Sequence, residues 1–262
     1  MKILYNQCDV VRVIALANQK GGVGKTTTAI NLGAGLAQLE KKTLIIDLDP
    51  QGNASVGLGI DRSKISISTY QLLLEDEVPA GIILPTANHH LFILPSTIEL
   101  AGAEIELVGM LSREFRLRDA LGGIRDAYDF VLLDCPPSLG LLTLNAMAAA
   151  GSILIPIQCE FYALEGVNQL LNSINLIRRR LNPNLEIEGV LLTMFDGRTI
   201  LSQEVERDVR AVFAGKVYHS VIPRSIRLSE APSYGRSILE YDPHSRGASA
   251  YLTLAQEVAN RA

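Results

Sequence analysis

The chain has 262 residues, of which 48% are hydrophobic, and its formal net charge at pH 7 is −4. This length and composition suffice for one large α/β domain or two small ones, and they argue against a disordered polypeptide and against nucleic-acid binding through bulk positive charge. The three cysteines, Cys8, Cys135 and Cys159, are too few and too widely spaced for a disulfide framework or for a zinc or iron–sulfur site.

Apolar, strand-like runs alternate with helix-like segments along the whole chain. Most runs are continuously apolar and rich in β-branched residues, which is typical of parallel strands covered on both faces. The alternation predicts an α/β fold, with a doubly wound, mostly parallel sheet, helices on both faces and a single domain spanning residues 1–262. The expected strands are 10–17, 43–48, 91–94, 130–134, 153–158, 187–194 and 217–222. The expected helices lie near 26–39, 69–75, 98–108, 112–121, 139–149, 163–181, 199–213 and 246–260.

Four local features refine this outline. Residues 1–9 are expected to form a flexible extension before the first strand. Ser112 is predicted to start a helix, and Asn182-Pro183 to end one. Residues 54–90 have the least regular pattern, which predicts a mobile insertion in this part of the chain.

The most informative stretch lies between the first expected strand and the first expected helix. It reads Asn18-Gln19-Lys20-Gly21-Gly22-Val23-Gly24-Lys25-Thr26-Thr27-Thr28. A strand, a glycine-rich loop and a helix form the setting of a phosphate-binding loop, because glycines let backbone N–H groups turn toward an anion and the helix start adds its own unpaired N–H groups. The stretch predicts a nucleotide site in which Lys25 reaches the β- and γ-phosphates and the Thr26 hydroxyl binds Mg²⁺.

This loop departs from the ordinary phosphate-binding pattern at one position. The ordinary pattern requires glycine at position 19, where this chain has Gln19, and an additional lysine, Lys20, follows. The second lysine raises the positive charge at the place where three phosphates are expected to lie.

Two acidic motifs follow later strands. One is Asp47-Leu48-Asp49-Pro50-Gln51-Gly52-Asn53 and the other begins at Asp134, which ends an apolar run and precedes Cys135-Pro136-Pro137. In doubly wound sheets, ligands bind at the carboxyl ends of the strands. Asp134 is therefore expected to bind Mg²⁺, and Asp49 to orient a water molecule at the γ-phosphate. Asp47 either takes part in this chemistry or forms a local hydrogen bond near the loop.

These motifs resemble the ParA/Soj family of chromosome- and plasmid-partition ATPases, whose phosphate-binding loop is a deviant Walker A motif. The resemblance extends from about residue 11 to 260, and the later strings favour the chromosomal branch. The matching strings are 18–28, 47–53, 133–138, 160–166, 193–199 and 222–233.

Membership of this family implies an ATPase that uses ATP and Mg²⁺ and closes into a two-fold nucleotide-sandwich dimer. Lys20 would reach across to the partner's phosphates, while Lys25 and Thr26 act within their own subunit and Asp49 positions the attacking water. Met194, Pro223 and Ser225 would contact adenine, although the family often has asparagine at the position of Ser225. The remaining nucleotide-binding residues implied by the resemblance are Gly21, Gly22, Val23, Gly24, Thr27 and Gln51.

The resemblance also implies partners. The ATP-bound dimer would bind double-stranded DNA without sequence preference through Arg198 and Arg227, and a ParB/Spo0J-type centromere-binding protein would stimulate hydrolysis. The charge distribution allows a local basic surface, since residues 176–262 carry a net charge of +2 and residues 1–175 carry −6. The expected location is the cytoplasm, in association with the nucleoid and not with a membrane.

Two other classes of protein share parts of this pattern. A MinD-like membrane-cycling ATPase has the same loop and acidic residues but needs a C-terminal amphipathic anchor, and residues 251–262 have no lysine-rich face. A metabolic relative, such as a dethiobiotin-synthetase-like ligase or a nitrogenase-reductase-like electron carrier, would not need Lys20 or would need cluster-binding cysteines. Both remain alternatives to the partition ATPase.

Overall fold

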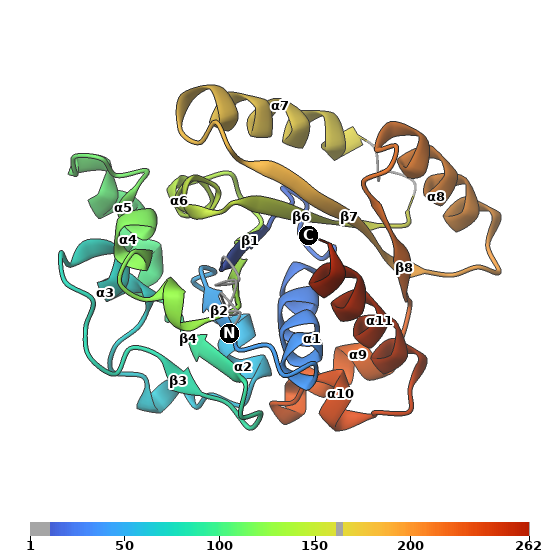
Figure 1. Cartoon of the computed structure of the whole chain (residues 1–262), viewed down its shortest axis with the longest axis horizontal. Helices are drawn as coiled ribbons and strands as arrows, with labels where there is room; N and C mark the ends of the chain where they lie inside the picture. Colours follow the sequence, from blue (N-terminus) through green and yellow to red (C-terminus); the bar gives the residue numbers. More distant parts are fainter. Residues whose placement is uncertain (1–10, 161–164, 262) are drawn as a thin grey trace, which may run out of the picture.

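The computed structural model describes residues 11–160 and 165–261, and it contains one eight-stranded sheet (Figure 1). The strand order is β3-β4-β2-β5-β1-β6-β7-β8, and all neighbouring strands are parallel except β3 and β4. The doubly wound, mostly parallel α/β fold is thereby confirmed. The strands are β1 (Arg12–Leu16), β2 (Thr43–Asp47), β3 (Leu84–Pro85), β4 (Leu91–Leu94), β5 (Phe130–Asp134), β6 (Ser152–Gln158), β7 (Glu186–Phe195) and β8 (Val217–Pro223).

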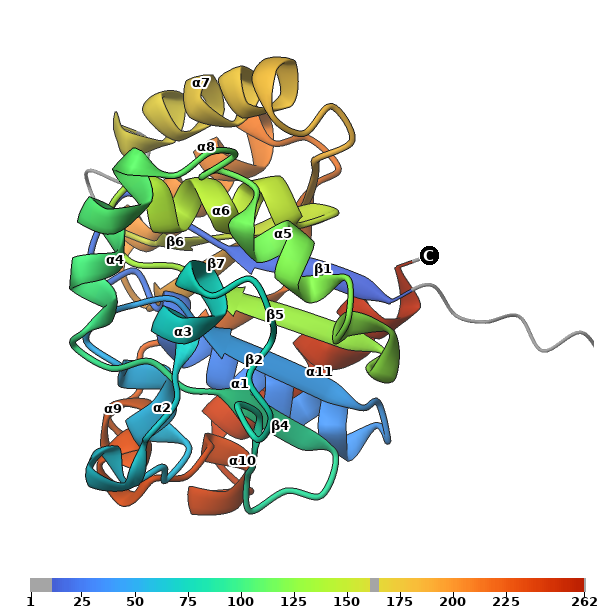
Figure 2. The same cartoon turned by 90° about the vertical axis from the view of Figure 1, so that its left-hand side faces the viewer.

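Helices cover both faces of this sheet. Successive strand residues point to opposite faces, and since both sets are apolar, both faces need cover. Val13 and Ala15 of β1 pack into the core under α3 to α8, whereas Ile14 and Leu16 pack against α1 and α11. Figure 2 shows α6 and α7 on one side of the strands and α1 with α11 on the other. The helices are α1 (Lys25–Gln38), α2 (Asn53–Gly57), α3 (Thr69–Leu74), α4 (Leu100–Glu106), α5 (Arg116–Leu121), α6 (Leu141–Ala149), α7 (Glu165–Arg180), α8 (Ile200–Val212), α9 (Ile226–Glu230), α10 (Ile238–Tyr241) and α11 (Arg246–Asn260).

Most of the expected elements are present, and the C-terminal segment is a core-facing helix as predicted. Tyr251, Leu254 and Val258 of α11 are buried in the core that it shares with α1. The helix stop at Asn182-Pro183 is also confirmed, since α7 ends at Arg180. Among the described residues, no helix combines the length and the apolar character that crossing a bilayer requires.

The predicted helix start at Ser112 is wrong. Ser112 adopts a left-handed backbone conformation with φ of 52°, and α5 begins at Arg116. The start is set by Asn145 of α6, whose side chain accepts from Leu117 N at 3.1 Å and donates to Arg113 O at 2.8 Å. A residue far along the chain therefore caps this helix, and no local pattern records that contact.

Residues 54–90 are not an irregular insertion. They contain most of α2, all of α3 and the short edge strand β3, and they bury Leu72, Leu73 and Ile82 in the core. The expected extension at residues 1–9 and part of the matching string at 160–166 lie outside the described residues.

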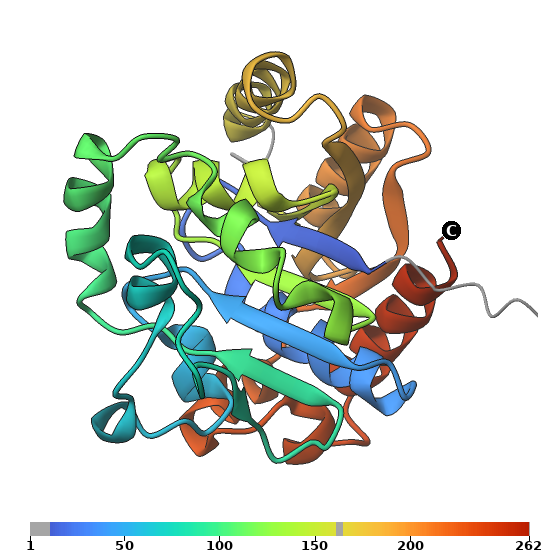
Figure 3. The same ribbon diagram turned by 60° about the vertical axis from the view of Figure 1, so that its left-hand side comes forward.

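The parallel strands end at one edge of the sheet, so the predicted motifs that follow them lie there together. Leu16 at the end of β1 is paired in register with Asp134 at the end of β5, and Asp134 with Asp47 at the end of β2. Figure 3 shows the arrows of the central strands pointing to this common edge. The loops that follow β1, β2 and β5 are consequently neighbours.

Candidate nucleotide site

The loop between β1 and α1 has the backbone that an anion site needs. Gly22 and Gly24 have φ values of 73° and 90°, a left-handed conformation that glycine adopts without the cost that a Cβ atom would impose. Gly24 is also the residue before the first turn of α1, where no side chain caps the helix. The unpaired N–H groups of that first turn therefore remain available to a phosphate.

Lys25 is held inside this loop. Its side chain is buried, and Nζ donates to the backbone oxygens of Asn18 at 3.1 Å and Lys20 at 3.2 Å. Burial lowers the pKa of the Lys25 ammonium, while the charges of Asp134 and Asp49 act in the opposite direction. The ammonium is therefore already placed at the loop by backbone acceptors.

Asn18 shapes the start of the loop, a role that sequence reasoning missed. Its side chain accepts from Lys20 N at 3.0 Å and donates to Pro156 O of β6 at 2.8 Å. The first of these contacts is an Asx-type turn, and an asparagine directly after a buried strand was the available signal. The second contact depends on tertiary packing.

Asp47 forms local hydrogen bonds behind the site, so the second of its two interpretations is the one that the structure favours. Its Oδ2 accepts from the backbone N and Oγ of Ser55 at 2.9 and 2.7 Å, and its Oδ1 accepts from Asp49 N at 3.2 Å. Burial raises the pKa of Asp47 to about 6, although the hydrogen bonds from Ser55 favour the charged form. Asp47 thus fixes the loop that carries Asp49.

Asp134 differs from Asp47 in that neither of its buried carboxylate oxygens has a hydrogen-bond partner. Burial raises its pKa well above the usual range, the charge of Asp47 adds to this effect, and the nearby Thr26 hydroxyl opposes it. An unpaired buried carboxyl is costly unless a cation or donor joins it. Asp134 together with Thr26 therefore fits a hard cation such as Mg²⁺, which takes oxygen ligands and completes its shell with phosphate and water.

A pocket on the loop side of the sheet edge brings several predicted residues together. It is lined by Gly21, Gly22, Lys25, Thr26, Asp49 and Gln51, and Asp49 Oδ1 accepts from Gln51 N at 2.9 Å. Lys20 is half-buried and is not among the residues that line this pocket. The backbone N of Lys20 donates to the Asn18 side chain, and its backbone O accepts from Lys25 Nζ. The Lys20 side chain is therefore not needed to line this pocket, although its backbone helps to build the loop.

A second pocket adjoins the first and collects the residues expected to contact adenine. Met194, Pro223 and Ser225 line it with Gly24 and Thr27, and Met194 lines both pockets. Met194 has a φ of 51°, which is uncommon for a residue other than glycine and marks a constrained backbone.

The pocket walls are joined to the loop by contacts that the motifs do not reveal. Thr193 Oγ1 donates to Val23 O at 2.8 Å, and Thr28 Oγ1 lies 3.2 Å from the Tyr251 hydroxyl. The first bond ties β7 to the glycine-rich loop, and the second contact ties α11 to the first turns of α1.

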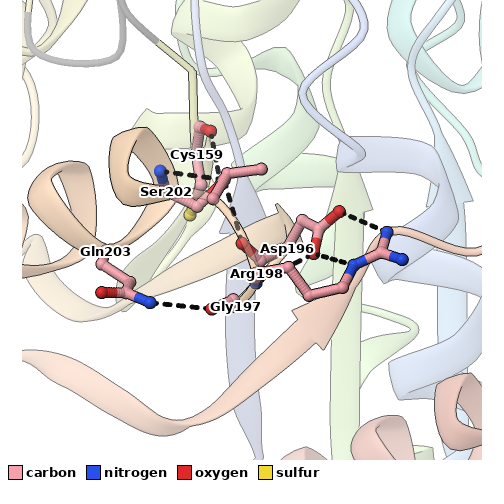
Figure 4. A network of polar contacts seen from close by, with 7 residues as sticks. Cys159, Asp196, Gly197, Arg198, Ser202 and Gln203 are labelled. Carbon is pink, nitrogen blue, oxygen red and sulfur yellow. Dashed lines mark hydrogen bonds and ion pairs between the residues drawn. The ribbon is translucent and has the colours of Figure 1, made fainter.

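The two candidate DNA-binding arginines lie outside these pockets and are both paired with carboxylates of their own chain. Arg198 is 89% exposed, and its Nε and Nη2 donate to Asp196 at 2.9 and 2.7 Å (Figure 4). Arg227 pairs with Glu230 at 3.1 Å and lies 3.6 Å from Asp242. Neither side chain contributes to the nucleotide pockets.

The turn that carries Arg198 is fixed by further hydrogen bonds, shown in Figure 4. Arg198 N donates to Asp196 Oδ1, Gln203 Nε2 donates to Gly197 O, and Ser202 Oγ donates to Cys159 O.

Cys159 and Cys135 are buried thiols with raised pKa values, and no cluster of metal-binding side chains is present in the described part of the chain.

Comparison with known proteins points to one family. A family model described as an AAA domain matches residues 11–187. The sporulation initiation inhibitor protein Soj of Bacillus subtilis is 55% identical over 248 residues, covering 95% of this chain and 98% of that protein. The chromosome partitioning protein ParA of Myxococcus xanthus is 52% identical over 252 residues, covering 96% of this chain and 89% of that protein.

A solved structure with bound nucleotide has the same fold. Cobyrinic acid a,c-diamide synthase from Mycobacterium smegmatis, with a bound ATP analogue and magnesium, superposes with a TM-score of 0.84 over 95% of each chain. Its sequence identity of 39% is lower than that of the two partition proteins. The bound nucleotide and metal of that structure agree with the oxygen-rich, lysine-bearing pocket described above.

Proposed function

Since the chain belongs to the Soj/ParA family of chromosome-partitioning ATPases, we propose that ATP and Mg²⁺ drive it into a nucleotide-sandwich dimer that binds DNA. The observation that carries this proposal is the position of Lys20. Its backbone builds the phosphate loop, yet its side chain does not line the phosphate pocket of its own subunit. A lysine that belongs to the loop but does not line this pocket is suited to reach the phosphates of a second copy.

The other site residues receive roles within their own subunit. Lys25 and the loop N–H groups bind the phosphates, and Thr26 with Asp134 holds the metal ion, which supplies charge stabilisation when bound. Asp49 orients the attacking water, because its carboxylate lines the same pocket as Lys25. Met194, Pro223 and Ser225 contact the base, and the remaining residues of the proposed nucleotide site are Gly21, Gly22, Val23, Gly24, Thr27 and Gln51.

The lysine from the partner has a physical reason. Two triphosphates held face to face repel each other, and a cation contributed by each subunit to the other's nucleotide offsets this repulsion. A cation that arrives only in the dimer also stabilises charge on the transferring phosphoryl group, as an arginine finger does. Hydrolysis then removes the γ-phosphate contacts that hold the two subunits together.

We place DNA binding on Arg198 and Arg227, whose guanidinium groups are exposed. The dimer presents each arginine twice, so modest phosphate contacts add up to binding that depends steeply on salt. A centromere-binding partner of the ParB/Spo0J type stimulates hydrolysis and releases the DNA. The proposed location follows from these partners and is the cytoplasm, on the nucleoid.

One experiment tests this function directly. DNA retention is measured by filter binding with ATP, with ADP and without nucleotide, and the oligomeric state is measured by light scattering with a non-hydrolysable ATP analogue and Mg²⁺. We expect a dimer and DNA retention with the triphosphate only. Lys20→Ala is expected to bind ATP but to remain a monomer, and a dimer formed by this variant contradicts the proposed role of Lys20.

A further inference from the structure

Ser55 is a buried polar residue behind the phosphate pocket that has no role among those proposed above. It is the third residue of α2, its exposure is 0%, and it follows Asp49 by six residues. A buried hydroxyl is costly unless its hydrogen bonds are made. Ser55 Oγ donates to Asp47 Oδ2 at 2.7 Å and accepts from Ser96 N at 3.0 Å, so the hydroxyl acts as donor and acceptor at once.

The bond from Ser55 to Asp47 belongs to the start of α2. Gly52 precedes this helix and provides no side-chain cap. Asp47 takes the place of that cap, because its Oδ2 also accepts from Ser55 N at 2.9 Å. One carboxylate oxygen thus receives two bonds from the same residue, and together they fix the rotation of the Asp47 side chain.

The other oxygen of this carboxylate holds the backbone of Asp49. Because a carboxylate is planar, fixing Oδ2 of Asp47 also fixes Oδ1, which accepts from Asp49 N at 3.2 Å. The turn is closed by Gly52 N, which donates to Asp49 O at 2.8 Å. The Asp49 side chain lines the phosphate pocket from this turn. A rotation of Asp47 would therefore displace the residue to which we assign the attacking water.

The bond from Ser96 to Ser55 ties the same turn to the end of β4. Ser96 follows this strand, and its backbone O lies 2.9 Å from the position that a Cβ atom on Gly52 would occupy. Thr69 of α3 adds a bond from its Oγ1 to Asp47 O at 2.8 Å. Segments from β2, α2, α3 and β4 meet around one hydroxyl, which alanine cannot replace.

Ser55 and Asp47 are both set back from the nucleotide. Neither lines the two pockets described above. Asp134, which is paired in register with Asp47, has two buried oxygens without a partner among the described residues, whereas both oxygens of Asp47 are engaged. Ser55 thereby keeps the carboxylate of Asp47 occupied and leaves that of Asp134 for a cation.

We propose that Ser55 is a positioning residue for hydrolysis, which holds Asp49 at the phosphate pocket through the carboxylate of Asp47. The inference rests on the proposed function, in which Asp49 orients the attacking water. Since Ser55 does not reach the nucleotide, its loss should slow the chemical step and leave the affinity for ATP nearly unchanged.

The test uses the full chain with Mg²⁺. The rate of hydrolysis is measured in a single turnover of radiolabelled ATP with the protein in excess, and affinity is measured by titration with a fluorescent ATP analogue. Ser55→Ala removes the hydroxyl, Ser55→Thr keeps it, and Asp49→Asn removes the group that is positioned. The matched control is Ser202→Ala, because Ser202 is a buried serine of α8 whose hydroxyl donates to Cys159 O.

We expect Ser55→Ala to hydrolyse ATP at least about fivefold more slowly than the parent, since a small displacement of a positioned group costs rate. Its ATP affinity should change by less than about twofold, and Ser55→Thr and Ser202→Ala should hydrolyse within about twofold of the parent. Ser55→Ala and Ser202→Ala each lose a buried hydroxyl and should both melt at a lower temperature than the parent. Asp49→Asn should hydrolyse most slowly.

The proposal is overturned if Ser55→Ala hydrolyses at the parent rate while Asp49→Asn is slow, or if Ser202→Ala slows hydrolysis equally. It is also overturned if Ser55→Thr is as slow as Ser55→Ala, or if ATP affinity falls as much as the rate does. Asp49→Asn at the parent rate refutes the role of Asp49 in the proposed function, and this inference with it. A parent that hydrolyses ATP but neither dimerises nor retains DNA refutes the proposed function alone, and the hydrolysis rates then still decide the role of Ser55.

Discussion

At the phosphate pocket, Lys25 and Asp134 are buried, and neither forms an ion pair among the residues that the structure describes, although their charges act on each other's pKa. At the turn between β7 and α8, in contrast, Arg198 is exposed and paired with Asp196. Burial weakens the solvation of the first pair of charges and makes any charged ligand there interact strongly. The Arg198 pair lies in water, where screening makes an ion pair weak.

This difference predicts how each region responds to substitution. The pocket stores unfavourable free energy in an unpaired carboxylate and a partly desolvated ammonium, and a nucleotide with its metal ion relieves both. The turn stores little, because water already solvates its charges. Changes in the pocket should therefore alter function and stability strongly, and changes at the turn should adjust affinity in small steps.

The largest effect is expected from Asp134→Asn. The amide keeps the shape of the side chain but cannot provide a charged oxygen to a metal ion, so hydrolysis at saturating Mg²⁺ and ATP should fall by at least about 100-fold. Asp126→Asn, at an exposed aspartate of similar chemistry, serves as the control and should hydrolyse like the parent. Hydrolysis within a few-fold of the parent in Asp134→Asn would remove Asp134 from the metal site.

Asp134→Asn should also change how the stability of the protein depends on pH. Burial and the charge of Asp47 raise the pKa of Asp134 in the folded protein, whereas an unfolded aspartate titrates near 4. Because the folded pKa is the higher one, the parent loses stability as the pH rises from about 4 through the folded pKa. Asp47, with its pKa raised to about 6, acts with the same sign. Asparagine carries no such penalty at position 134.

The stability advantage of Asp134→Asn should therefore grow between about pH 4.5 and pH 7, by at most about 1.4 kcal/mol for each pH unit that lies between the unfolded and the folded pKa. Urea unfolding of the nucleotide-free protein at the two pH values measures this change. Asp61→Asn provides a control of opposite sign, because hydrogen bonds from Ser63 lower the pKa of Asp61 at an exposed site. This variant should gain no stability advantage as the pH rises. An advantage of Asp134→Asn that is equal at both pH values contradicts the assignment.

The sequence predicts the pocket well because its geometry is largely local. Gly22 and Gly24 have left-handed φ values that a tight loop before a helix demands, and Asp134 ends a strand whose apolar run defines its position. The β1–loop–α1 unit fixes the glycines and Lys25 within a short stretch, and the parallel pairing of β5 with β1 brings Asp134 to the same edge of the sheet. The family resemblance adds the metal, the nucleotide and the proposal that Lys20 acts on a second copy.

The sequence does not predict contacts between residues that are distant along the chain. Asn145 sets the start of α5, Pro156 receives the Asn18 amide, and Thr193 fixes the loop at Val23. Each contact depends on the packing of one strand or helix against another. The two-residue edge strand β3 escapes prediction for a related reason, because its pairing with β4 decides its conformation more than its own residues do.

Arg198→Glu probes the exposed region, where the expected effect is intermediate. The dimer loses two favourable phosphate contacts and gains two repulsive ones, so DNA retention at low salt should weaken by about tenfold or more while ATP binding is unchanged. The slope of log affinity against log salt concentration should become shallower by the amount that about two phosphate contacts contribute. Arg207→Glu on α8 serves as a control for net charge. Equal retention by the parent and Arg198→Glu would place the DNA surface elsewhere, and Arg227→Glu tests the second half of the assignment.

The smallest effect is expected from Asp196→Asn. In the present turn, Asp196 accepts from Nε, Nη2 and the backbone N of Arg198, so a DNA phosphate must exchange with a carboxylate that already occupies the guanidinium fork. Asparagine keeps an oxygen for the backbone N–H of Arg198, and the turn is further held by the bond from Gln203 to Gly197, so the variant removes charge and keeps geometry.

DNA affinity of the ATP-bound Asp196→Asn dimer should rise by roughly two- to fivefold at low salt, because an exposed ion pair competes only weakly with a phosphate. The gain should disappear when Arg198→Ala is added, since the competition requires the guanidinium. An increase that persists in the double variant would mean that Asp196 repels DNA directly, and the turn would then contribute by its net charge instead of through the pairing of Arg198. A weaker affinity in the single variant would mean that Asp196 orients Arg198 for binding. The exposed ion pair would then prepare the turn for its ligand, as the buried charges prepare the pocket.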